Sequence, residues 1–289
     1  MTSELKELLP EPVEIDESEI LPPPKKWSIA TWVIPHLVSI QKYSVIPFTV
    51  FSALHLSSTI FVPAVAGPGA GEDVFTMART IYQAPGIEET MVLGAAGTHV
   101  LSGVLLRICR KIKHDSEYGK QKRRSKAYMT EAEKAKDADF GLGGFFSLFG
   151  FGSKQSVVSK KFGISPSVFS GYLLTVLLTC HVASLRLAPL LVDGDSSYVS
   201  LAYISHIFNR SPIFTSGALG LLTAVGTYHM SSGWLRILHK FSLNWKRAAY
   251  GSIALTCALL SVALSKVGSL GLQTGFMAAK FDAYHDYFH

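Results

Sequence analysis

The chain has 289 residues, of which 48% are hydrophobic and 17% are charged, and its formal net charge is +6. The apolar residues gather in five runs without Asp, Glu, Lys or Arg, a pattern that excludes an ordinary soluble domain. Each run is close to the roughly 20 apolar residues that cross a hydrocarbon core. We therefore predict an all-α polytopic membrane protein with five transmembrane helices, over residues 43–71, 90–106, 163–185, 211–235 and 248–265.

The first 26 residues precede these runs and differ from them in composition. They contain seven acidic and three basic residues and no long apolar run, which is typical of a disordered tail. The tail has neither the layout of a secretory signal nor the Arg-rich composition of a matrix presequence. Residues 27–41, which include Trp27 and Trp32, predict an interfacial lead-in to a transmembrane domain over residues 42–280.

One segment of this tail is a candidate for binding a partner. In "LKELLPEPV" the apolar residues Leu5, Leu8 and Val13 flank Pro10 and Pro12. A Pro-x-Pro pair presets an extended backbone, so it loses little conformational entropy on binding. The later stretch "ILPPPKK" is a second candidate. Proline-containing acidic tails also serve as simple spacers, and that alternative stays open.

Basic residues are concentrated on one side of the predicted helices. Of the 27 Lys and Arg residues, 14 lie within residues 107–163, the loop between the second and third helices. Basic loops stay on the cytoplasmic side of a membrane. The N-terminus and this loop are therefore predicted to be cytosolic, and the C-terminal tail, residues 281–289, lies on the opposite side. A loop facing membrane lipids accounts for the positive charge, so no nucleic-acid partner is predicted.

The predicted helices contain an internal repeat. "TVFSALHLSSTIFVP" in the first helix matches "TVLLTCHVASLRLAP" in the third, with His and Pro at the same positions. "GTHVLSGVLLR" in the second helix resembles "GTYHMSSGWLR" in the fourth. Two helices per unit make this a parallel repeat. We therefore predict a four-helix bundle of two tandem two-helix repeats, followed by a fifth helix.

The repeat places two histidines at one depth of the membrane. His55 and His181 precede Pro63 and Pro189 by eight residues each. At ~1.5 Å rise per residue, both histidines lie about 12 Å from the non-cytoplasmic boundary that the prolines mark.

A second pair lies nearer the other face. His99 and His229 precede Arg107 and Arg236 by eight and seven residues. This spacing puts them about 10–12 Å from the cytosolic boundary. All four histidines have a serine three residues later, on the same helix face.

Two imidazoles at equal height in a bundle are what axial coordination of a haem iron requires. The sequence therefore predicts two haem b groups, one on His55 and His181 and the other on His99 and His229. Two further groups of residues are candidates for binding the cofactor. Gly103 and Gly233, one turn after two of the histidines, leave room for a flat macrocycle. The arginines near the membrane boundaries can neutralise haem propionates: Arg107, Arg186 and Arg236. The alternative is that the histidines only hydrogen-bond neighbouring helices. His206 is expected to be a loop residue.

At these residues the chain resembles two known families. The four-histidine, five-helix layout is similar to the two-haem cytochrome b anchor subunits of succinate dehydrogenase and fumarate reductase. "QKYSVIPFTVFSALHL", "THVLSGVLLRICR" and "HMSSGWLR" resemble the transmembrane domain of a fungal mitochondrial outer-membrane adaptor family, found as a suppressor of lost endoplasmic-reticulum tethering. That resemblance covers roughly residues 43–266. It implies recruitment of a bridge-like lipid-transfer protein of the vacuolar-protein-sorting-thirteen type through a Pro-x-Pro segment.

Three functions follow as expectations. The first is a non-enzymatic adaptor in the mitochondrial outer membrane, acting in lipid homeostasis at organelle contact sites, with its N-terminus cytosolic and its C-terminus in the intermembrane space. The second is a cytochrome b-type membrane subunit that carries electrons between two haems, which would need partner subunits. The third is a haem-handling membrane protein.

Overall fold

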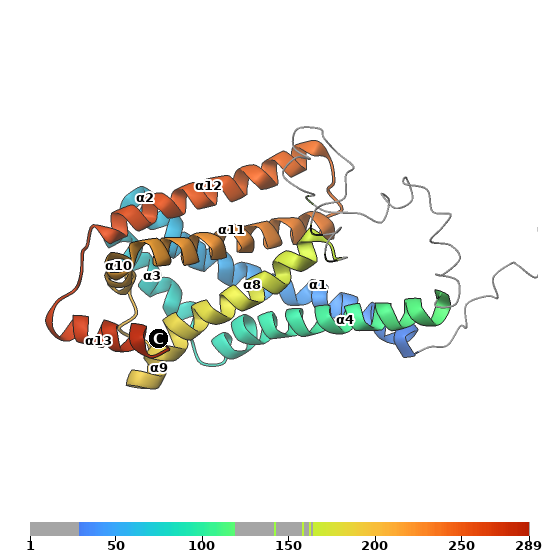
Figure 1. The fold of residues 1–289 in the computed structure, drawn as a ribbon, viewed down its shortest axis with the longest axis horizontal. Coiled ribbons are helices and arrows are strands. Elements are labelled where there is room, and N and C mark those ends of the chain that lie inside the picture. Colours follow the sequence, from blue (N-terminus) through green and yellow to red (C-terminus); the bar gives the residue numbers. More distant parts are fainter. Residues whose placement is uncertain (1–28, 119–141, 143–157, 159–161, 163, 289) are drawn as a thin grey trace, which may run out of the picture.

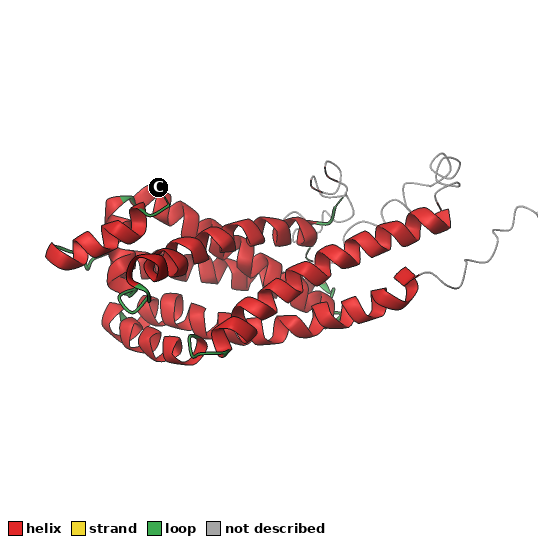
Figure 2. Ribbon diagram, turned by 90° about the horizontal axis from the view of Figure 1, so that it is seen from below, coloured by secondary structure: helices red, strands yellow, loops and turns green. Residues whose placement is uncertain are grey.

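The computed structural model describes residues 29–118, 142, 158, 162 and 164–288. These residues form helices and connecting turns, and the described part contains no strand (Figure 2). The prediction of an all-helical chain is therefore confirmed. The acidic tail with its Pro-x-Pro segment lies outside the described residues, as does most of the basic loop over residues 107–163.

The long helices lie along the long axis of the described part (Figure 1). They form five rods. Three rods combine α-helix with a π-helical turn, written η, and two are unbroken. Their bounds are α1 (Ile29–Leu56), η2 (Ser57–Phe61) and α2 (Val62–Ala66); η3 (Glu88–Gly94) and α4 (Ala95–Tyr118); α8 (Pro166–Val182), η5 (Ala183–Leu187) and α9 (Ala188–Asp193); α11 (Pro212–Ile237); and α12 (Leu243–Gly268). Shorter helices are α3 (Pro68–Tyr82), α10 (Leu201–Arg210) and α13 (Gly275–Asp286).

Within the described residues, four rods are long and apolar enough to cross a membrane: Trp32–Ala66, Glu88–Lys113, Pro166–Asp193 and Leu243–Gly268. The chain is thus a polytopic helical membrane protein. Helix α11, the fourth of the five predicted spans, is not among them by composition. It has 26 residues, but glycine, serine and threonine occupy many of its positions.

The two prolines that mark the membrane boundary in the sequence repeat lie inside helices. Helix continues past Pro63 to Ala66 and past Pro189 to Asp193. The π-helical turns η2 and η5 end two residues before these prolines, and each starts two residues after a histidine of the repeat. Proline lacks an N–H and its ring crowds the preceding turn of a regular helix. A wider π turn relieves that conflict, so the helix continues.

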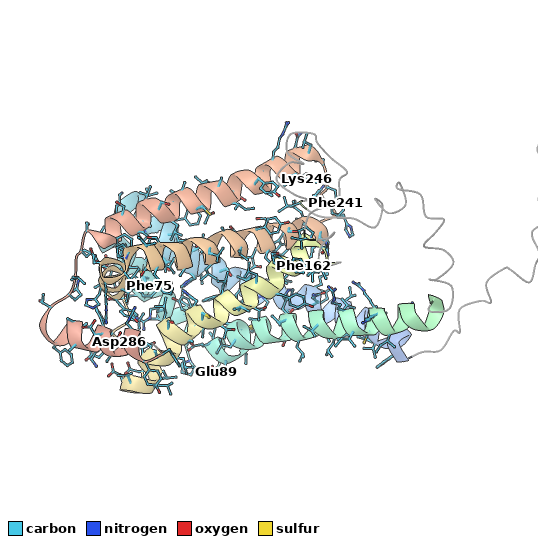
Figure 3. The ribbon with its side chains drawn as sticks, viewed as in Figure 1. Phe75, Glu89, Phe162, Phe241, Lys246 and Asp286 are labelled. Atoms are coloured by element: carbon cyan, nitrogen blue, oxygen red, sulfur yellow. The ribbon has the colours of Figure 1, made fainter. Side chains whose placement is uncertain are left out.

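The two ends of the bundle differ. Phe241 and Lys246 lie at the end where α11 turns into α12, whereas Phe75 and Asp286 lie at the opposite end (Figure 3). Helices α3, α10, α9 and α13 gather at this second end (Figure 1). The start of α1 and the end of α4, which lead into the acidic tail and the basic loop, lie towards the first end (Figure 1).

The structure adds detail at two segments of the predicted division and contradicts the expectation for His206. Residues 29–41 of the predicted lead-in form the first part of α1, which is continuous from Ile29. The predicted C-terminal tail is helical through Asp286, and its Phe281 and Tyr284 are buried against α10. His206 is not in a loop, because it is buried in α10. Its Nε2 lies 3.0 Å from Oδ1 of Asp282, and its Nδ1 accepts a hydrogen bond from the backbone N–H of Gln273.

The long helices associate as pairs. α1 packs along α4, and α11 packs along both α8 and α12. The described part therefore contains an α1–α4 pair facing an α8–α11 pair. Between these pairs, Nε1 of Trp234 on α11 donates a hydrogen bond of 3.2 Å to Oγ1 of Thr49 on α1.

Candidate functional site

The four histidines of the repeat meet as two ring pairs between the α1–α4 and α8–α11 helix pairs. The ring centroids of His99 on α4 and His229 on α11 are 6.2 Å apart, with an angle of 77° between the ring planes. Those of His55 on α1 and His181 on α8 are 6.1 Å apart, at 78°. The residues that the sequence pairs by depth are thus brought together, and nearly the same geometry occurs at both levels.

Both rings of the His99–His229 pair are held by the backbone of a neighbouring helix. Nδ1 of His99 lies 3.1 Å from the carbonyl oxygen of Gln41 on α1, and Nδ1 of His229 lies 3.1 Å from that of Ser167 on α8. A carbonyl only accepts, so each Nδ1 carries the proton and donates. The proton therefore sits on Nδ1 in both neutral rings, and each Nε2 keeps a free lone pair.

Hydroxyl groups and a glycine complete the setting of these two rings. The hydroxyls of Ser44 and Ser170 lie 3.5 and 3.2 Å from Nδ1 of His99 and His229 respectively. Gly171 gives the His229 ring its space, because a Cβ at this position would lie 2.8 Å from the ring carbon Cε1. Gly171 was not predicted as a site residue.

The His55–His181 pair has a different environment. Within the described residues, Nδ1 of His55 is buried and has no hydrogen-bond partner. Aromatic rings surround it instead: Phe51 stacks on the His55 ring at 5.4 Å, and Tyr82 of α3 meets that ring edge-on at 6.1 Å. Burial raises the pKa of the Tyr82 hydroxyl to about 12, so this group stays neutral at physiological pH.

A cavity of about 290 Å³ adjoins this pair. His55 and His181 line it together with apolar side chains of the surrounding helices, and its polar end is formed by Arg79, Glu88 and Arg186. Arg186 is held by Glu88 through two hydrogen bonds of 2.7 and 2.6 Å. The cavity is therefore amphipathic, with imidazoles in its apolar part and guanidinium groups at its polar end.

The other predicted site residues are placed differently. A Cβ at Gly103 would meet the Gln41 amide at 2.8 Å rather than a histidine, and one at Gly233 would meet nothing within 4 Å. Arg107 and Arg236 are exposed.

Of the four serines that follow the histidines, Ser58 and Ser102 donate to the carbonyls of the histidines three residues before them. These serines thus stabilise their own helices.

Arg79 is the main site residue that the sequence analysis missed. A signal was available: Arg79 is the only Lys or Arg within residues 64–89, a connection that the charge rule assigns to the side poor in basic residues. A single cation in such a connection indicates a specific role for that residue.

The helical rods and the buried histidine pairs define the class of the protein as a polytopic α-helical membrane protein with ionisable groups inside its bundle. The chain belongs to the family described as MDM10-complementing protein 1, transmembrane domain, which it matches over residues 50–156 and 176–276. It is 30% identical over 198 residues to the mitochondrial adapter protein MCP1 of Saccharomyces cerevisiae. That alignment covers 68% of this chain and 62% of the relative, so the chain spans about three fifths of the length of that relative. No solved structure matches the chain.

Proposed function

We propose that the protein is a non-enzymatic adaptor of the mitochondrial outer membrane that recruits a bridge-like lipid-transfer protein of the vacuolar-protein-sorting-thirteen type to contact sites. The observation that carries this proposal is membership of the MDM10-complementing protein 1 family together with similarity to a mitochondrial adapter protein. In this proposal the recruiting segment is Leu5 to Val13, with Pro10 and Pro12 as its rigid centre.

The layout of the helices supports this role for the tail. α1 starts at the same end of the bundle as the turn that carries Lys246 (Figure 3). If the basic end faces the cytosol, so does the tail. We further propose that α11 is the fifth span, because its 26 residues give a length of about 39 Å and it lies alongside α8 and α12.

The recruitment proposal is tested by replacing Pro10 and Pro12 with alanine in the full chain. We expect the fluorescently tagged lipid-transfer protein to leave mitochondria while the variant remains inserted at its normal level, because the tail lies outside the helical bundle. The matched control replaces Pro22 and Pro24 with alanine. Loss of recruitment in the control alone would move the binding segment to "ILPPPKK", and full recruitment by all variants would leave the tail as a spacer.

We also propose that the bundle holds two haem b groups, one on His55 and His181 and one on His99 and His229. Two imidazoles on opposite sides of one metal ion have ring centres about 6.2 Å apart, from about 2.0 Å per metal–nitrogen bond and about 1.1 Å from nitrogen to ring centre. The two ring pairs are 6.1 and 6.2 Å apart. The partnerless Nδ1 of buried His55 and the adjoining cavity also favour a ligand there.

The residues of the chain would perform distinct tasks in such a site. The carbonyls of Gln41 and Ser167 hold the protons of His99 and His229 on Nδ1, so that each Nε2 keeps a lone pair for a metal. The apolar side chains around His55 and His181 keep water from the ring pair. A bound haem would supply one-electron chemistry. This is the basis for the second candidate, a cytochrome b-type subunit, and for the third, a haem-handling protein.

An absorption spectrum of the protein purified in detergent tests the haem proposal. We expect Soret and α bands on reduction with dithionite, with two components. His55→Ala and His181→Ala should remove one and the same component, and His99→Ala and His229→Ala the other. If His55→Ala and His99→Ala remove the same component, the pairing is wrong. If haem neither copurifies nor binds on addition, the histidines act only in helix packing.

A further inference from the structure

Arg79 is a half-buried cation that has no carboxylate in ion-pair contact within the described residues. Its Nε donates to Oε1 of Gln83 at 3.2 Å, Nη2 donates to the carbonyl of Ser196 at 2.6 Å, and Nη1 donates to the carbonyl of Val199. Nη2 also donates to the Ser196 hydroxyl at 3.4 Å, which leaves one of the five N–H groups of the guanidinium without an acceptor among these contacts. All four acceptors are neutral, and Arg79 forms no ion pair within the described residues. Burial lowers the pKa of the guanidinium, which reflects the cost of holding this charge away from water.

Neighbouring arginines differ from Arg79 in this respect. Arg186, at the same end of the cavity, pairs with Glu88 at 2.6 Å. Arg210 pairs with Asp282 and Asp286 at 2.6 and 3.1 Å. Buried charges in proteins are ordinarily paired. Arg186 and Glu88 pair with each other at the polar end of the cavity. Glu72 and Asp195 attract Arg79 electrostatically but are not in ion-pair contact with it in the described residues. Arg79 is therefore the guanidinium at this end that has no carboxylate in direct contact.

Arg79 is connected to the histidine pair by a short series of contacts. Tyr82 lies three residues after Arg79 and so shares its face of α3. The Tyr82 ring meets Phe51 edge-on at 5.1 Å, and Phe51 stacks on His55. The cavity beside His55 and His181 is lined by all four of these residues, Arg79, Tyr82, Phe51 and His55. A ligand whose metal centre is held by the histidines would have its anionic group at the guanidinium end.

We propose that Arg79 binds a carboxylate of the amphipathic ligand in this cavity and is a specificity-determining residue of the site. The inference rests on the proposed haem site, in which the carboxylate is a haem propionate. For this end of the bundle the sequence suggested Arg186, which pairs with Glu88, whereas Arg107 and Arg236 follow the histidines of the other pair and are exposed. The remaining hydrogen-bonding capacity of Arg79, and its lack of a contacting carboxylate among the described residues, distinguish it from Arg186.

The test compares two ligands that share iron and macrocycle, of which only one carries carboxylates. Full-length protein, purified in detergent from haem-deficient cells, is titrated with haem and with haem dimethyl ester, which keeps the iron and the macrocycle but has no carboxylates. For the wild-type protein we expect the His55–His181 component to bind haem about tenfold more tightly than the ester, as a hydrogen bond to a charged group provides. Arg79→Gln should remove this preference, and Arg79→Lys should keep part of it.

Two controls separate binding from folding. Arg210→Gln removes an arginine whose carboxylate partners are outside the cavity, so its haem preference should equal that of the wild type. The His99–His229 component should be unchanged in Arg79→Gln, which shows that the bundle is intact.

The outcomes are distinguishable. A full preference for haem over the ester in Arg79→Gln overturns the role of Arg79, as does a wild-type protein that binds both ligands equally, and neither result affects the haem proposal. If the wild-type protein binds neither ligand, the haem proposal fails and this inference fails with it. The adaptor proposal, which rests on the family and the tail, is untouched by that result.

Discussion

Gly171→Ala should disrupt one histidine pair and leave the other intact. The new Cβ would lie 2.8 Å from Cε1 and 3.3 Å from Nδ1 of His229, whereas ordinary contacts start at 3.4 Å. The ring must therefore move by about 0.6 Å or more. Such a movement strains the hydrogen bonds of Nδ1 to the Ser167 carbonyl and the Ser170 hydroxyl, which are 3.1 and 3.2 Å long.

The substitution should lower the free energy of unfolding only modestly, and its main effect should be on the orientation of the His229 ring. Overpacking costs about 1–3 kcal/mol, and a weakened hydrogen bond costs about 1 kcal/mol more. The higher helix propensity of alanine returns about 1 kcal/mol. The net loss of stability is therefore about 1–3 kcal/mol, spread over a bundle that stays folded, whereas the ring of His229 loses its orientation towards His99.

The assay is the reduced absorption spectrum together with electron paramagnetic resonance of the oxidised protein, recorded at equal protein concentration. If the bundle holds the two proposed haem groups, we expect the spectral component of the His99–His229 site to shift or disappear and that of the His55–His181 site to remain. Gly226→Ala is the matched control, because its Cβ would meet only Leu174 at an ordinary 3.6 Å. Equal loss of both components, or an unchanged spectrum in a folded Gly171→Ala protein, would refute the assignment of Gly171 to the His229 ring.

Three further predictions follow from the same structure. Protease added to intact mitochondria should remove an N-terminal tag and spare a C-terminal one, and the reverse pattern would contradict the orientation and the adaptor proposal together. Gly268→Ala should lower the thermal unfolding midpoint by the equivalent of about 1–3 kcal/mol, because its Cβ would lie 2.6 Å from the Phe208 ring, while Gly220→Ala, with nothing within 4 Å, should not. Asp282→Asn should make α13 more sensitive to limited proteolysis, since Asp282 accepts from His206 and Arg210, and unchanged cleavage would show that apolar packing alone holds α13.

Helix content, and which histidines meet, could be predicted from the sequence because both depend on local rules. A run of about 20 apolar residues must hydrogen-bond its own backbone in a membrane, so it is helical. Helical rise is constant, so equal spacing from a shared feature places His55 beside His181 in height. Pro63 and Pro189 lie inside their helices, and the pairing by height still holds because both helices continue past the proline in the same way.

Other features depend on contacts that no local rule contains. His206 follows an apolar run by sequence and looks like a loop residue, but α10 is fixed by Phe281 and Tyr284, more than 70 residues later. Arg79 acquires its acceptors from the carbonyls of Ser196 and Val199, on a distant connection. The space that Gly171 leaves for His229 likewise exists only between two packed helices.

The π-helical turns η2 and η5 have a consequence for how each rod faces its surroundings. Every residue of an α-helix turns the next side chain by about 100°, and a π turn contains one more residue than an α turn. The segment after the turn is therefore out of phase with the segment before it by about that angle. One rod can then direct His55 towards the bundle interior and, further on, direct the Ala64 carbonyl to Nζ of Lys266, which donates to it at 2.7 Å. Removing a single residue from η2 would restore a regular helix and turn everything beyond it away from its present neighbours. A one-residue deletion there should be more damaging than any single substitution in the same turn.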